Sequence, residues 1–253
     1  MLDSLDLDIA DLALVWGIFL AGGLVKGITG FGLPTVALGL LALTRPLPEA
    51  MALVLVPTIA TNIWQAFASG ALRPVLRRLW GFVLAGAVCT LAASGLLSRA
   101  DATRLAGLLG LLLVLSSALA LLGPRWPVPP PEKERWLSPL MGGLSGLLAG
   151  LTGSFMMPAA PWLAALRLPA DHFVQGFGLG AVTVTLVLAS SMLGQGLLPA
   201  NAGLTSLVGL VPAFLAMSVG RHLRRNLPEA GFRRVVQVAL LLLGLYLAAR
   251  AFL

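Results

Sequence analysis

Cysteine and charged residues are scarce in this chain of 253 residues. It contains one cysteine, and only 11% of its residues are charged, whereas 58% are hydrophobic. A single cysteine, Cys89, excludes an intramolecular disulfide and a cysteine-based metal cluster. So few charges leave too little polar surface to cover a water-soluble globule of this size. The composition therefore indicates a protein that lies in lipid.

Motifs for catalysis and cofactor binding are also missing. The chain has no His-Glu-x-x-His helix, no nucleophile elbow, no paired aspartates within apolar runs and no Walker lysine. The two histidines, His172 and His222, lie beside an aspartate and among arginines, without the partners of a metal or catalytic site. We therefore expect no enzyme activity, no metal and no cofactor.

The net charge of +7 does not indicate a nucleic-acid partner. The arginines form short clusters between apolar runs instead of following one polar face, which is the pattern of topology signals in a membrane protein. The partner predicted by this pattern is a lipid bilayer.

Apolar runs recur from Ile9 to Leu253 and predict an all-α polytopic membrane protein. In hydrocarbon every backbone N–H and C=O group needs an internal partner, so such runs must be helical. Breaks at glycine, proline and charged clusters divide the chain into ten segments. The segments are 9–29, 31–44, 49–70, 75–97, 103–123, 137–152, 154–166, 172–197, 203–222 and 231–252.

The two halves of the chain resemble each other. Residues 23–30, GLVKGITG, align with residues 146–153, GLLAGLTG, at an offset of 123, and Pro46 aligns with Pro169 at the same offset. A proline-rich polar stretch separates the halves. We interpret residues 1–123 and 137–253 as two membrane repeats and residues 124–136 as a cytoplasmic linker.

Five segments in each half predict an inverted repeat, because an odd number of crossings reverses the orientation of the second half. With an extracytoplasmic N-terminus, which its acidic residues Asp3, Asp6, Asp8 and Asp11 also favour, twelve basic residues fall on the cytoplasmic side and four on the other. The twelve are Arg73, Arg77, Arg78, Arg125, Lys133, Arg135, Arg167, Arg221, Arg224, Arg225, Arg233 and Arg234. The four are Arg45, Arg99, Arg104 and Arg250. Four continuous spans per half would give nine against seven, so the inverted arrangement is favoured.

Segments 31–44 and 154–166 are too short to cross about 30 Å of hydrocarbon and predict broken or re-entrant half-helices. Irregular backbone is tolerated in a membrane where it lines a cavity, and the start of a helix presents free N–H groups that favour anions. The predicted substrate-binding residues are Gly27, Thr29, Gly30, Phe31 and Gly32 at the first break and Gly150, Thr152, Gly153 and Ser154 at the second. The alternative is that these glycines serve close helix packing, as Gly-x-x-x-Gly spacing does.

Three further polar residues lie within apolar segments. Lys26 is placed where a charge costs roughly 2.5–3.5 kcal/mol, and we expect it to attract an anion or to exchange a proton during transport. Its alternative is snorkelling of the ammonium group to the membrane surface. Asn62 and Gln65 are expected to line the same cavity, with hydrogen bonding between helices as the alternative.

The motif from Gly27 through Gly32 to Pro34, repeated from Gly150 through Ser154 to Pro158, resembles the sulfite exporter TauE/SafE family of permeases. The resemblance extends over essentially the whole chain, although Lys26 and the pair Ser154-Phe155 depart from the family pattern. It implies a bacterial inner-membrane transporter of small sulfur-containing anions, such as sulfite, sulfoacetate or other organosulfonates, that works without ATP.

We therefore expect a secondary transporter, most simply an exporter, whose coupling to protons or sodium the sequence leaves open. Two alternatives remain. One is an integral-membrane enzyme acting on a lipid-like substrate, and the other is a membrane assembly subunit that transports nothing.

Overall fold

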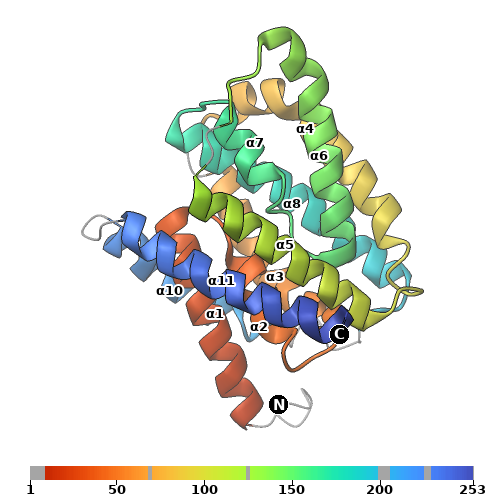
Figure 1. Cartoon of the computed structure of the whole chain (residues 1–253). Coiled ribbons are helices and arrows are strands. Elements are labelled where there is room, and N and C mark those ends of the chain that lie inside the picture. Colours follow the sequence, from red (N-terminus) through yellow and green to blue (C-terminus); the bar gives the residue numbers. More distant parts are fainter. Residues whose placement is uncertain (1–8, 68–69, 124–125, 199–205, 225–228, 253) are drawn as a thin grey trace. The chain divides into compact units, whose positions relative to one another are not determined.

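A computed structural model of the chain (Figure 1) describes residues 9–67, 70–123, 126–198, 206–224 and 229–252, and these ranges contain helices and no strand. Asp3, Asp6, Asp8, Arg125 and Arg225 of the charge pattern, and residues 203–205 of the ninth segment, lie outside them. The helices are α1 (Ile9–Thr29), α2 (Leu33–Leu41), α3 (Leu47–Phe67), α4 (Leu72–Ser94), α5 (Ala102–Leu122), α6 (Pro131–Thr152), α7 (Ala159–Ala165), α8 (Ala170–Gly194), α10 (Leu210–Leu223) and α11 (Glu229–Phe252).

Six of these helices are long and apolar enough to cross a membrane: α1, α3, α4, α5, α8 and, from Gly231, α11. The all-α polytopic membrane fold is therefore confirmed. The two short segments end up shorter than expected, with nine residues in α2 and seven in α7. At 1.5 Å per residue they extend only about 14 and 10 Å, much less than the thickness of the hydrocarbon core.

Helix α6 starts earlier than the sixth predicted segment. It begins at Pro131 instead of residue 137, so the last part of the predicted linker is helical. The physical reason is visible in the sequence, because proline suits the first turn of a helix, and Glu132 and Glu134 in that turn interact favourably with the helix dipole.

The chain forms two compact units, each built from both halves of the sequence. The first unit comprises residues 1–58, 100–122 and 196–253, and the second comprises residues 59–99 and 123–195. Within the first unit, α5 and α11 pack closely, and a Cβ atom added to Gly110 would lie 2.7 Å from the Gly244 carbonyl oxygen. Helix α1 packs on α10, and α2 turns back along α1, where Gly22 faces Leu33.

In the second unit, α4 and α6 lie side by side and run in the same direction (Figure 1). Gly142 contacts Phe82, and Gly146, one turn later, contacts Gly86. The Thr90 hydroxyl donates a hydrogen bond to the Gly146 carbonyl oxygen at 2.9 Å. Helix α8 packs on α4, and Gln195 near its end donates to the Ser94 carbonyl oxygen at 2.9 Å.

A serine completes α3 where a proline interrupts it. Pro57 has no N–H group, so the Leu53 carbonyl cannot accept the usual helical hydrogen bond. The Ser206 hydroxyl donates to that carbonyl at 2.7 Å and accepts a hydrogen bond from the Val56 N–H at 3.0 Å. A residue from the second half of the sequence thus satisfies the backbone of a helix in the first half.

Candidate functional site

The first glycine break is a defined turn at the end of α1. Gly30 adopts a positive φ of 88° and donates its N–H to the Lys26 carbonyl oxygen at 2.8 Å. The Thr29 hydroxyl lies 2.9 Å from the Val25 carbonyl oxygen and accepts a hydrogen bond from the Phe31 N–H at 3.3 Å. This left-handed glycine satisfies a helix-end carbonyl, and α2 starts three residues later.

The second break repeats these contacts residue by residue, and at the first break the Thr29 hydroxyl also lies 2.7 Å from the Phe31 carbonyl oxygen. Gly153 has a φ of 75° and donates its N–H to the Ala149 carbonyl oxygen at 2.8 Å. The Thr152 hydroxyl donates to the Leu148 carbonyl oxygen at 2.7 Å and accepts from the Ser154 N–H at 3.3 Å. Each residue in these hydrogen bonds is numbered 123 higher than its counterpart in the first break, so the sequence similarity extends to the hydrogen bonds.

The two breaks differ after the turn. Gly32 gives the first break a second left-handed residue, with φ of 99°. Its counterpart is Phe155, whose ring centroid lies 5.8 Å from that of Phe82 and 5.9 Å from that of Phe177. An aromatic side chain therefore fills the second unit at the position where the first break has bare backbone.

Close helix packing explains two of the predicted glycines. A Cβ atom on Gly27 would lie 2.9 Å from the Gly220 Cα atom in α10, and one on Gly150 would lie 2.8 Å from the Thr90 carbonyl oxygen in α4. These positions accept no side chain because a neighbouring backbone occupies the space. Contact of Gly27 and Gly150 with a substrate stays a prediction.

Lys26 is buried, with a relative exposure of 2%. Burial of the whole side chain argues against snorkelling, which requires the ammonium group to reach water. Its counterpart in the second half is Ala149, which is equally buried. The sequence therefore places one buried cationic side chain at the first break and none at the second.

Asn62 and Gln65 are buried near the end of α3, with exposures of 1% and 7%. Gln65 faces α8, because a Cβ atom on Gly178 would lie 2.8 Å from the Gln65 Cβ atom. Beside them is Gln175, which the sequence analysis missed; it is fully buried and donates to the Ala66 carbonyl oxygen at 2.7 Å. The signal for it was a glutamine inside an apolar segment.

The predicted residues fall into two groups. Lys26, Gly27, Thr29, Gly30, Phe31 and Gly32 belong to the first unit, and Asn62, Gln65, Gly150, Thr152, Gly153 and Ser154 belong to the second. That the two groups share one cavity stays a prediction. Among the described residues, no three of His, Cys, Asp and Glu gather as a metal site would require.

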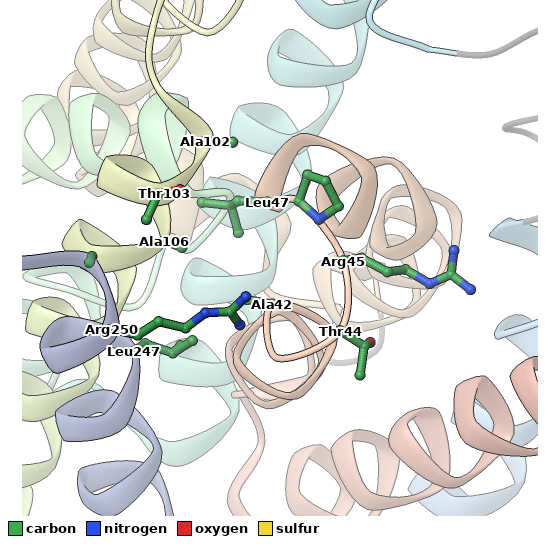
Figure 2. Close-up of a pocket in the computed structure, with 11 residues that line it drawn as sticks. Ala42, Thr44, Arg45, Leu47, Ala102, Thr103, Ala106, Leu247 and Arg250 are labelled. Atoms are coloured by element: carbon green, nitrogen blue, oxygen red, sulfur yellow. The ribbon is translucent and has the colours of Figure 1, made fainter.

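A cavity of about 220 Å³ lies in the first unit where the turn between α2 and α3 meets the ends of α5 and α11 (Figure 2). Arg250 reaches from α11 toward that turn and donates to the Leu43 carbonyl oxygen at 3.1 Å. Arg45 extends away from Arg250 and forms an ion pair with Asp11 at 3.2 Å. Arg45 and Arg250, which the charge pattern assigns to one side of the membrane, therefore line the same cavity.

A family model described as "Sulfite exporter TauE/SafE" matches residues 14–247 of the chain. The matched range includes both glycine breaks and extends from α1 into α11. No significant match was found among curated proteins or solved structures.

Proposed function

The chain belongs to the sulfite exporter TauE/SafE family, and from this membership we propose that it is a secondary exporter of sulfite, sulfoacetate or related organosulfonates. The family is one of membrane transporters of sulfite-type anions, and the six apolar spans agree with a multi-pass protein of the bacterial inner membrane. We also propose that the chain is a transporter and not an enzyme.

The structural observation that supports this proposal is the repeated hydrogen-bond geometry of the two breaks. Each break ends a long helix at a left-handed glycine and precedes a short helix that is too short to span the membrane. The start of α2 offers the Leu33 N–H group and the positive end of the helix dipole to an oxyanion, whereas at α7 the Ala160 N–H already donates to the Met156 carbonyl oxygen and Pro161 has no N–H group. A sulfite or sulfonate group has three oxygens that can accept such hydrogen bonds.

Lys26 supplies the charge in this proposal. A buried ammonium group one turn before Gly30 compensates part of the negative charge of a sulfur oxyanion at the first break. Because Lys26 has no charged counterpart at the second break, the proposed site is electrostatically asymmetric. A proton exchanged at Lys26 would couple transport to the proton gradient, and backbone carbonyl oxygens at the breaks would suit sodium instead.

Two helix contacts support the inverted repeat that we propose for the whole chain. Gly27 of α1 packs on α10, and its counterpart Gly150 of α6 packs on α4. In each case a break helix from one half packs in parallel on a helix from the other half, at corresponding positions. Two equivalent repeats that assemble symmetrically are expected to pack in this way, each with its break helix against the other repeat.

The test is uptake of labelled sulfite and sulfoacetate into proteoliposomes under an imposed proton or sodium gradient, comparing wild type, Lys26→Met and Lys133→Met. We expect saturable wild-type flux without ATP, a loss of at least about tenfold in Lys26→Met, and unchanged flux in Lys133→Met. The control removes the other lysine of the chain, which is exposed in the first turn of α6. Flux of both anions at the rate of empty liposomes, from folded protein, would refute the proposal.

A further inference from the structure

A basic pocket lies between α4 and α6 in the second unit, outside the glycine breaks. Its volume is about 420 Å³, and it is lined by residues that include Arg77, Arg78, Trp80, Glu134, Arg135 and Pro139. Pro139 packs on Gly81 within this lining, where α4 and α6 approach each other closely.

The pocket carries excess positive charge. Arg78 donates two hydrogen bonds to the Glu134 carboxylate, at 2.7 and 2.9 Å, so these two charges neutralise each other and fix the wall of the pocket. Glu134 is the only acidic residue in the lining. The charges of Arg77 and Arg135, both exposed, are therefore available to an anion.

The surface that continues from the pocket is apolar. Trp80, at the edge of the pocket, is 62% exposed. Further along the helices, Leu84 of α4 is 56% exposed and Leu140 of α6 is 53% exposed. In a membrane protein such leucines face lipid tails, and tryptophan side chains favour the depth of the lipid headgroups. Arg77, Arg135 and Trp80 thus lie at the border between the charged residues and the exposed apolar surface of α4 and α6.

We propose that this pocket binds the phosphate group of an anionic phospholipid from the cytoplasmic leaflet. The charge pattern assigns Arg77, Arg78 and Arg135 to the cytoplasmic side, and basic pockets between helices on that side suit anionic headgroups. A free anion would interact with the arginines alone, whereas a phospholipid also places its acyl chains along Leu84 and Leu140. The lipid therefore uses both features of the site.

Native mass spectrometry of the purified full-length chain, with dioleoyl phosphatidylglycerol and dioleoyl phosphatidylcholine added in equal amounts, tests the proposal. We expect wild type to retain phosphatidylglycerol preferentially by about tenfold or more, because one basic residue near an anionic surface contributes about fivefold in association constant. Arg77→Gln/Arg135→Gln should bind the two lipids within about twofold of each other.

The matched control is Arg99→Gln/Arg104→Gln, which removes two exposed arginines away from the pocket and should keep the wild-type preference. If the pocket variant melts well below wild type in lipid-free detergent, the single variant Arg135→Gln replaces it, because Arg135 is exposed in the first turns of α6. Its preference for phosphatidylglycerol over phosphatidylcholine should be about fivefold lower than that of wild type. An equal loss in both double variants would overturn the proposal. So would displacement of phosphatidylglycerol by millimolar inorganic phosphate, which would make the pocket a free-anion site.

Discussion

A single hydroxyl group organises the backbone at each helix break. The hydroxyls of Thr29 and Thr152 both bond to the carbonyl one turn earlier and to the N–H two residues later. Threonine at these positions therefore has a structural role that is independent of any substrate. A contribution to anion binding would come in addition, through the turn that the hydroxyl holds.

Thr29→Val should lower the melting temperature of the detergent-solubilised protein, because it removes the hydroxyl and keeps the side-chain shape. Loss of a buried hydrogen-bonding partner costs about 1–3 kcal/mol. Thr29→Ser retains the hydroxyl and should stay closer to wild type. If Thr29→Ser lowered the melting temperature as much as Thr29→Val does, the effect would come from packing of the methyl group and not from the hydrogen bonds.

The sequence marked polar residues within and beside the apolar runs, but it did not indicate the partners of all buried polar groups. Lys26 was identified because a charge within an apolar run is costly unless it has a role, and Thr29 and Thr152 because they lie at the two glycine breaks. Ser206 and Gln175 were missed as partners of α3, because their acceptors, Leu53 and Ala66, lie far away in the sequence. A one-dimensional pattern does not contain these pairings.

At the scale of elements, hydrophobic runs predicted the helices well, and α1 has the predicted bounds of residues 9–29. The short helices α2 and α7 were expected as half-helices but are shorter than the apolar runs that contain them, because α2 begins only after the left-handed Gly32 and α7 only after Pro158. The first turns of α6 were not predicted, because they contain Glu and Arg residues and a hydropathy criterion ends an apolar segment at such residues.

Ser206→Ala should destabilise the protein by about 1–3 kcal/mol, because it leaves the buried Leu53 carbonyl without its donor. Pro57→Ala restores a backbone N–H that can take over that role. We therefore expect a smaller cost of Ser206→Ala in the Pro57→Ala background, measured as a double-mutant cycle of thermal unfolding. The same cost in both backgrounds would contradict a role of Ser206 in completing α3.

Gly146→Ala should destabilise the protein by at least about 1 kcal/mol, because its Cβ atom would lie 2.7 Å from the Gly86 Cα atom and force α4 and α6 apart. Gly17→Ala is the matched control in α1, where an added Cβ atom meets nothing within 4 Å. In that position alanine should be neutral or stabilising, since it favours the helix. Equal effects of the two substitutions on the melting temperature would exclude close packing as the reason for glycine at position 146.

At the scale of the whole molecule, the sequence predicted two successive halves, whereas compact packing groups segments from both. Each unit contains helices from before and after the linker. The predicted repeat concerns the order of similar motifs along the chain, and the contacts show which segments pack together. Periodicity and motif offsets do not predict this grouping of segments, because it depends on which apolar helix faces pack together in three dimensions.

The Ser206–Leu53 hydrogen bond also has a consequence for biosynthesis. Its partners are 153 residues apart, so at roughly 5–20 residues per second the ribosome needs on the order of 8–30 s to deliver the serine after the leucine. During that interval the Leu53 carbonyl lacks its serine donor, and Gly27 of α1 lacks its packing partner α10. The first half alone therefore lacks contacts that it has in the complete chain, and these form only once Ser206 and α10 have been made.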